Sequence, residues 1–190
     1  MLTFRPATLA DAPFVARGVI MALHLDPEQE DMSLVASICS REDVLYSWRN
    51  TLLACVDGLP VGLCLCYDGK DYHETRIRTF QLFSEGKEGE EDDMDLANME
   101  DETGPGEYYI DSLAVMPEFR RQGIARQLML AQLEIGRKMG LHKATLLVDP
   151  ANPSAQSLYR QCGFVHDRDI YAFGQIYWKW EVTLSDVPTQ

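Results

Sequence analysis

Hydrophobic and polar positions follow different periods along the first half of the chain, and these periods predict both helices and strands. Phe4 to Ala7 is typical of the end of a first strand, and apolar residues then recur at helical spacing over 12–23. A second helical pattern runs from Leu34 to Trp48. The apolar runs 51–56 and 61–67 flank an Asp-Gly dipeptide, which predicts a β-hairpin.

The second half predicts a strand–helix–strand unit. Residues 107–115 form an apolar strand pattern, and the loop 120–126 enters a helix that Gly140 ends. The run 144–148 is apolar with little alternation, as in a buried strand. This order implies a parallel strand pair with a right-handed crossover. Asn152-Pro153 then opens another helix, as N-cap and first helical residue, and two closing strands follow.

Residues 84–107 differ from the sequence around them, because they are acidic, contain glycine and carry little helical spacing. We interpret them as a surface insertion within one domain that spans residues 1–190. A solvated loop and a lid over a substrate site are both compatible with this composition. A length of 190 residues suits one substantial core.

Charge narrows the choice of partner. The formal net charge of -13 disfavours DNA or RNA as the principal partner. It favours a cationic or amine-bearing substrate by long-range steering, although it could equally serve solubility alone. No run approaches the length of a membrane span and no secretory signal is visible, so neither a membrane partner nor secretion is expected, and we expect a cytoplasmic protein.

The cysteines are odd in number, and most lie in apolar neighbourhoods. Cys64 and Cys66 would lie on the same face of a strand, but the histidines offer no matching ligand spacing. We therefore expect buried reduced thiols and no metal site. The five cysteines are Cys39, Cys55, Cys64, Cys66 and Cys162.

The loop 120–126 has the features of a phosphate site. A glycine turn before a helix presents unpaired backbone N–H groups and the positive end of the helix dipole to one point. Gly123 lets a ligand approach the backbone closely, and the small Ala125 leaves the helix start uncrowded. Three arginines lie in these seven residues of an acidic protein. The loop lacks the Lys-Ser/Thr pair of a P-loop, so nucleotide hydrolysis is poorly supported.

Two ordered motifs resemble signatures of the GNAT superfamily of N-acetyltransferases. Leu113-Ala114-Val115-x-Pro117-x-Phe119-Arg120-x-x-Gly123-x-Ala125 resembles its acetyl-CoA-binding signature. Asn152-Pro153-x-Ala155-x-x-Leu158-Tyr159-x-x-Cys162-Gly163-Phe164 resembles its second signature. The resemblance is close over about residues 107–165 and loose elsewhere. It implies a single α/β domain in which helices flank a mixed, mostly antiparallel sheet of about seven strands, with a splayed parallel pair that binds the cofactor.

The resemblance also implies an N-acetyltransferase that uses acetyl-CoA as co-substrate and a primary amine as acceptor, in direct attack within a ternary complex. The backbone of β-strand residues Leu113 and Val115 would pair with the pantetheine arm, and the Val115 N–H would point at the thioester oxygen. Asn152 would bind the arm as well as cap its own helix, although capping alone would explain it. The cofactor-binding residues implied are Leu113, Ala114, Val115, Arg120, Arg121, Gln122, Gly123, Ile124, Ala125, Arg126, Asn152, Ala155 and Tyr159.

Three groups are candidates for proton transfer. Tyr159 is expected to protonate the thiolate leaving group, the alternative being a tyrosine packed against the sheet. Asp111 and Glu107 are candidate bases on the strand that leads to the reaction centre. We expect Asp111 to share strand parity with Leu113 and Val115, and a substrate-orienting or structural role for it stays open.

Other functions are compatible with the same residues. The same fold could sense acetyl-CoA without catalysis, could transfer another acyl group, or could bind phosphate alone. The acceptor is open among small amines, amino acids, antibiotics, polyamines and protein N-termini. Trp178 and Trp180, on one face of the last strand, could pack at the seam of a homodimer.

Overall fold

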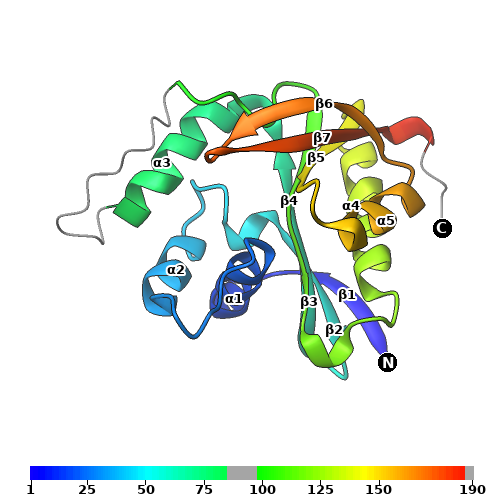
Figure 1. The fold of residues 1–190 in the computed structure, drawn as a ribbon. Coiled ribbons are helices and arrows are strands. Elements are labelled where there is room, and N and C mark those ends of the chain that lie inside the picture. The colour runs from blue at the N-terminus through cyan, green and yellow to red at the C-terminus, as the bar shows by residue number, and fades with distance from the viewer. Residues whose placement is uncertain (85–97, 187–190) are drawn as a thin grey trace.

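Seven strands form one sheet in the order β1-β2-β3-β4-β5-β7-β6 (Figure 1). The structure is a computed structural model that describes residues 1–84 and 98–186. All neighbouring strands are antiparallel except β4 and β5. The strands are β1 (Leu2–Pro6), β2 (Thr51–Val56), β3 (Leu59–Asp68), β4 (Glu107–Val115), β5 (Lys143–Val148), β6 (Val165–Ala172) and β7 (Gln175–Thr183). The expected single mixed α/β domain with a mostly antiparallel sheet is confirmed.

Within residues 1–84 and 98–186, five helices flank this sheet (Figure 1). They are α1 (Ala12–Ala22), α2 (Met32–Cys39), α3 (Tyr72–Ser84), α4 (Ile124–Lys138) and α5 (Pro153–Gln161). One core lies under α4 and α5, and a second lies under α1 and α2. Leu128 and Leu133 are fully buried in the first, and Val15 and Val19 in the second. Helices α1 and α4 each bury an apolar stripe, and the side chains of Leu63 to Tyr67 on β3 alternate between the two cores.

One helix boundary and one whole helix differ from the sequence-based expectation. The second helix ends at Cys39 and does not reach Trp48, because Ser40 caps it and the buried Val44, Leu45 and Tyr46 follow in irregular backbone. Their helical spacing reflects burial rather than helical conformation. Helix α3 was not anticipated, and its low apolar content explains why.

The parallel pair β4–β5 is joined only at one end. Three residue pairs are in register, Glu107 with Lys143, Tyr108 with Ala144 and Tyr109 with Thr145, and no pairing continues toward Val115. β5 remains paired with β7 along its whole length, while β4 remains paired with β3. The two halves of the sheet therefore separate beyond Tyr109, as the expected splayed pair requires.

A β-bulge interrupts β4 at Asp111. The register with β3 shifts so that Leu65 faces Ser112 while Cys66 faces Ile110. Asp111 contacts Tyr67, whose side chain belongs to the core under α1 and α2, whereas Leu113 and Val115 pack in the core under α4. The expectation that Asp111 shares strand parity with these two residues was wrong, because the extra residue of a bulge reverses the side-chain alternation.

Part of the acidic insertion lies inside the fold. Residues 85–97 lie outside the described residues, so the choice between solvated loop and lid is untested there. Glu102 and Thr103 are buried, so the interpretation as a surface segment was wrong for this part. The buried guanidinium of Arg76 on α3 donates to the carbonyls of Met99 and Glu100 and pairs with Asp101 at 3.1 Å. Helix α3 thereby fixes the segment that brings Glu102 to the sheet.

The last strand packs within the protomer. Trp180 is 2% exposed and contacts Tyr159 of α5, while Trp178 packs against the same core. The chain's own helix therefore covers Trp180, and a dimer seam there has no support from this face.

All five cysteines are free and buried, as expected, and the thiols of Cys64 and Cys66 lie 3.5 Å apart. No helix in the described ranges is long and apolar enough to cross a membrane.

Candidate active site

A cleft of about 1520 Å³ opens where β4 and β5 separate. From β4 it is lined by Tyr109, Asp111, Leu113, Ala114 and Val115. The loop before α4 and the start of α5 contribute to one side, and α3, the segment after α1 and the β6–β7 hairpin to the other. The cleft therefore passes through the splayed sheet and is reached by side chains from both cores.

The loop between β4 and α4 presents free backbone N–H groups to this cleft. Gly123 is the N-cap of α4 with φ of 77°, and Arg121 also has a left-handed φ of 63°. Within the described residues, none of the N–H groups of residues 122–126 donates to another protein group. Together with the dipole of a helix of 15 residues, these groups form an anion site. Gly123, Ile124, Ala125 and Arg126 line the cleft and Gln122 does not, and the binding of a diphosphate by this loop stays a prediction.

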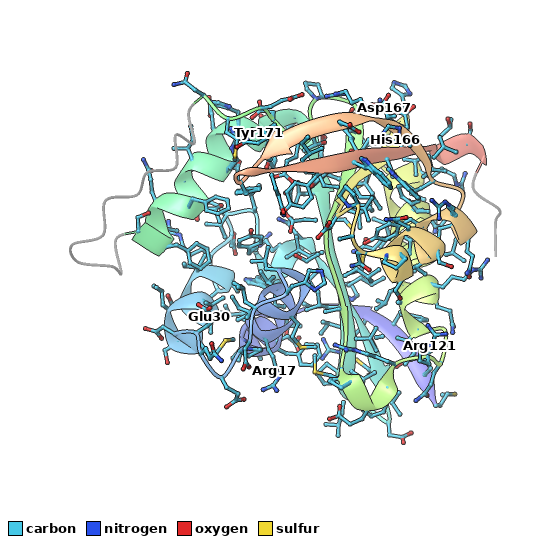
Figure 2. All side chains as sticks on the ribbon, viewed as in Figure 1. Arg17, Glu30, Arg121, His166, Asp167 and Tyr171 are labelled. Atoms are coloured by element: carbon cyan, nitrogen blue, oxygen red, sulfur yellow. The ribbon has the colours of Figure 1, made fainter. Side chains whose placement is uncertain are left out.

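The three arginines of the loop differ in their roles. The Arg120 Nε donates to the Val115 carbonyl at 3.0 Å. Arg120 therefore ties the loop to the end of β4, and its place in the structure is that of a positioning residue. Arg121 and Arg126 are exposed and line the cleft, and Figure 2 shows Arg121 in this loop, on the side of the sheet away from α2.

The backbone of β4 offers two further donors at the gap. Met116 N donates to Val61 O, so in this antiparallel pair the N–H groups of Met116, Ala114 and Ser112 face β3. The N–H groups of Leu113 and Val115 consequently point toward β5, where no strand pairs with them. They are available to a ligand that lies between the strands.

The start of α5 lies on the same cleft. Asn152 Oδ1 accepts a hydrogen bond from Ala155 N at 3.0 Å, which is the expected N-cap, and both residues line the cleft. The Asn152 Nδ2 lies 3.5 Å from His24 Nε2, which follows α1. The capping role of Asn152 is thus visible, while its role toward a cofactor remains a prediction.

Tyr159 reaches the cleft from the middle of α5. Its ring contacts Phe164 and Trp180 at centroid distances of 6.1 and 6.5 Å. The side chain is half-buried and lines the cleft. Burial raises the pKa of Tyr159 above its usual value, so the phenol is protonated at neutral pH. A protonated phenol beside the cleft can act as a proton donor.

Asp111 enters the cleft from the opposite face of the sheet. Its carboxylate accepts hydrogen bonds from the Tyr67 hydroxyl at 2.6 Å and from the Ser112 hydroxyl at 2.8 Å. Burial raises the pKa of Asp111 to about 6, and the nearby negative charge of Glu102 acts in the same direction. A carboxyl group with this pKa can accept a proton near neutral pH.

Glu107, the other candidate base, lies outside the cleft among cationic and hydroxyl partners. Its carboxylate accepts from the buried Lys179 ammonium at 2.7 Å and from the Thr103 and Thr145 hydroxyls, and it lies 3.3 Å from Lys143 Nζ. Burial alone would raise its pKa, but the bond to Lys179 outweighs it, so the pKa of Glu107 lies below its usual value. Glu107 does not line the cleft, and it joins the closed end of the β4–β5 pair.

Sequence reasoning missed the residues on the far side of Asp111. Glu102, Tyr72, Tyr109, Phe80 and Tyr46 all line the cleft there. No motif marked them, because they come from four separate segments that only the fold brings together. In the described part of the chain, no group of three His, Cys, Asp or Glu residues could hold a metal ion.

Comparison with known proteins places this geometry in a family. The model of the acetyltransferase (GNAT) family matches residues 21–164. N-alpha-acetyltransferase 30 of Schizosaccharomyces pombe is 34% identical over 65 residues, which are 34% of this chain and 43% of that protein. The match thus spans less than half the length of this curated relative.

Solved structures agree with the fold over nearly the whole chain. A crystal structure of an acetyltransferase has a TM-score of 0.75 at 26% identity and covers 96% of this chain and 99% of its own. The structure of yncA from Salmonella typhimurium with its cofactor acetyl-CoA has a TM-score of 0.63 at 15% identity and covers 100% and 98%. With a family model that matches most of its residues, the chain belongs to the acetyltransferase (GNAT) family.

Proposed function

We propose that this protein is an N-acetyltransferase that moves the acetyl group of acetyl-CoA to a primary amine by direct attack in a ternary complex. The observation that carries the proposal is the gap between β4 and β5, which begins beyond Tyr109 and ends at a loop with free backbone N–H groups. Family membership and a neighbour with bound acetyl-CoA support the same cofactor.

The site offers acetyl-CoA two kinds of contact. The diphosphate binds the N–H groups of residues 122–126, with the side chains of Arg121 and Arg126 nearby. The pantetheine arm extends from there along β4 as an added strand and pairs with Leu113 and Val115. Asn152 and Ala155 border the arm from α5.

The reaction then needs proton transfer from the amine, stabilisation of the oxyanion, and proton transfer to the leaving thiolate. Asp111, directly or through water, takes a proton from the protonated acceptor, since only the neutral amine attacks. The amine nitrogen forms a bond to the thioester carbon, and the N–H of Val115 donates to the resulting oxyanion, a contact worth about 3 kcal/mol in comparable sites. The carbon–sulfur bond breaks, Tyr159 protonates the departing thiolate, and the proton that the amide nitrogen must lose returns through water to the Tyr159 phenolate.

Covalent catalysis has little support in this chain. All five cysteines are buried, and burial raises the pKa of Cys39, Cys66 and Cys162. Such thiols are protonated and poor nucleophiles. Isolation of an acetylated enzyme after incubation with acetyl-CoA alone would contradict direct transfer.

The experiment that tests the function measures thiol release from acetyl-CoA with a panel of amines, beside calorimetric binding of acetyl-CoA without acceptor. Binding together with amine-dependent release of free CoA supports the proposal. Binding without release for any amine would favour a sensing module of the same fold. Parallel assays with longer acyl-CoA thioesters report the acyl preference.

A further inference from the structure

The same cleft continues beyond Asp111, and we name this part of it the acceptor pocket. Its lining residues come from α3, the segment after the acidic insertion, the loop before β2 and the β6–β7 hairpin. They are Leu45, Tyr46, Tyr72, Phe80, Glu102, Tyr109, Asp111, Phe173, Gln175 and Tyr177. If acetyl-CoA binds as proposed, the amine must lie in this pocket, so an inference about the amine rests on the proposed function.

Two carboxylates and several aromatic rings define the chemistry of the acceptor pocket. Glu102 is 9% exposed, and its Oε1 accepts from the Tyr72 hydroxyl at 2.5 Å while its Oε2 accepts from the Tyr109 hydroxyl. Asp111 lies nearby: its partner Tyr67 stacks on the Tyr72 ring, with centroids 6.3 Å apart, and contacts the tilted Tyr109 ring at 5.7 Å. Each carboxylate keeps lone pairs free for a further donor.

The acceptor pocket has no lysine or arginine of its own to balance these charges. Among the described residues that line the whole cleft, the lysine and arginine positions are Arg120, Arg121 and Arg126, all of the loop before α4. Arg76 lies over the Tyr72 ring at 5.2 Å but is committed to Asp101 and to two backbone carbonyls. Burial raises the pKa of both Asp111 and Glu102, although the charges of Arg76 and Lys179 act in the opposite direction on Glu102.

Aromatic contacts limit the length of this pocket. Phe173 lies at the tip of the β6–β7 hairpin and contacts Phe80 of α3, with ring centroids 5.8 Å apart. Tyr46 contacts Phe80 in turn at 6.4 Å. The hairpin reaches across the sheet to α3, as Figure 1 shows, and Figure 2 shows Tyr171 on this hairpin beside α3. These contacts join two walls of the pocket on the side away from the splayed strands.

We propose that the acceptor is a compact diamine: one nitrogen reacts beside Asp111, and the second stays protonated and binds Glu102 among the tyrosine rings. The second ammonium group donates to the free lone pairs of the Glu102 carboxylate and lies against aromatic faces, which attract cations. Two positive charges then match the two carboxylates. Tyr72 and Tyr109 act as positioning residues that hold the Glu102 carboxylate.

A matched pair of acceptors tests this inference without any substitution. 1,4-Diaminobutane and n-butylamine share chain length and reacting group and differ in the second nitrogen. The parent enzyme should use the diamine with kcat/KM at least on the order of tenfold higher, mainly through KM, because a charge-assisted hydrogen bond is lost with the monoamine. Equal kcat/KM for the two amines would overturn the inference.

Two substitutions locate the effect. Glu102→Gln keeps the shape and should lower kcat/KM for the diamine toward that for the monoamine. The readout is the ratio of the two kcat/KM values, because loss of the Glu102 charge also acts on the pKa of Asp111 with either amine. Glu100→Gln removes the same charge two residues away, at a side chain that is 51% exposed and does not line the cleft, and should leave the preference intact. A preference that survives Glu102→Gln, or falls equally in both variants, would contradict the assignment of Glu102.

The outcomes separate this inference from the proposed function. Acetylation of monoamines or peptides, with no advantage for the diamine, overturns the diamine and leaves the acetyltransferase. Acetyl-CoA binding with no transfer to any amine overturns both. A folded Glu102→Gln protein, checked by circular dichroism and by unchanged acetyl-CoA binding, is required for the comparison; if it does not fold, the acceptor pair in the parent enzyme decides.

Discussion

Two carboxylates four residues apart on β4 have pKa values shifted in opposite directions. Glu107 faces the buried Lys179 ammonium at 2.7 Å, which holds its pKa below the usual value. Asp111 faces two hydroxyls and the negative Glu102, and burial raises its pKa to about 6. The partner that the fold supplies, and not the residue type, makes one group an ion-pair member and the other a candidate base.

Tyr159→Phe tests the general acid. The substitution removes the phenolic proton but keeps the ring between Phe164 and Trp180. We expect kcat to fall by roughly 10²-fold or more, while acetyl-CoA affinity changes little. Steady-state kinetics and calorimetry measure the two quantities, and a kcat equal to that of the parent would remove Tyr159 from the mechanism.

The pH profile tests Asp111. The base must be deprotonated, so kcat at saturating acceptor should decline as pH falls through about 6. Asp111→Asn should be slow and should lack this acidic limb. An unchanged limb in the variant would assign the titration to another group.

The pH dependence of stability tests the raised pKa of Asp111 independently of catalysis. The folded pKa lies above the unfolded value, so the folded state holds the extra proton between about pH 4 and 6. The free energy of unfolding contributed by this group therefore falls as pH rises through that window. In Asp111→Asn, the free energy of unfolding measured by urea denaturation should change less between pH 4 and 6. An equal pH dependence in parent and variant would contradict the raised pKa of Asp111.

At the scale of elements, the start of α4 and the end of β4 together form the part of the cleft that we propose binds acetyl-CoA. The loop between them needs left-handed backbone at Arg121 and Gly123 to turn the N–H groups toward the cleft. A side chain at 123 would not crowd the loop, because a Cβ there would meet only Gln127 Nε2 at 3.9 Å. The requirement for glycine is therefore the φ of 77° and not space.

Gly123→Val is therefore predicted to weaken acetyl-CoA binding by changing the backbone conformation of the loop. A β-branched residue at this φ costs about 1–2 kcal/mol or shifts the backbone, which misdirects the N–H groups. Acetyl-CoA affinity should fall strongly in calorimetry. Gly140→Val is the matched control, since Gly140 ends α4 with φ of 78° and open space, away from the cleft. It should lose stability but keep its affinity, and equal loss of affinity in both would argue against a phosphate site at Gly123.

At the scale of the molecule, the splay depends on what holds the sheet together at its other end. Glu107 joins β4 to Lys143 of β5 and Lys179 of β7, and Thr103 adds the segment after the insertion. Lys179 is 2% exposed, so its charge is stabilised chiefly by Glu107. The same cluster keeps the strands paired just below the point where they separate.

Glu107→Gln should consequently destabilise the whole fold. It leaves the Lys179 ammonium buried without its close carboxylate, a loss of about 3–5 kcal/mol in comparable sites. Urea denaturation measures the change. Glu134→Gln, which removes the exposed partner of Arg137 on α4, should change stability little. Similar midpoints for the two variants would show that the cluster does not hold the sheet.

Local rules predicted much of the fold from the sequence. The turn residues Asp57-Gly58, the cap Asn152 and the helix end at Gly140 all lie where their patterns placed them. The glycine loop and the strand–helix–strand order located the free N–H groups before α4 and the parallel strand pair, because both depend on contiguous backbone. The end of α2 was misplaced, because burial of Val44 and Leu45 imitates a helical period. Helix α3 was missed, because it carries few apolar residues.

The sequence by itself determined the strand–loop–helix that offers N–H groups to an anion, since neighbouring residues suffice to set those dihedral angles. Only the tertiary structure decided which carboxylate enters the cleft, because one extra residue in β4 turns Asp111 to the opposite face from Leu113. It likewise brought Glu102 between Tyr72 and Tyr109 from a distant segment. Such contacts depend on strand register and on packing across the sheet, so the residues next to each side chain in the sequence do not determine them.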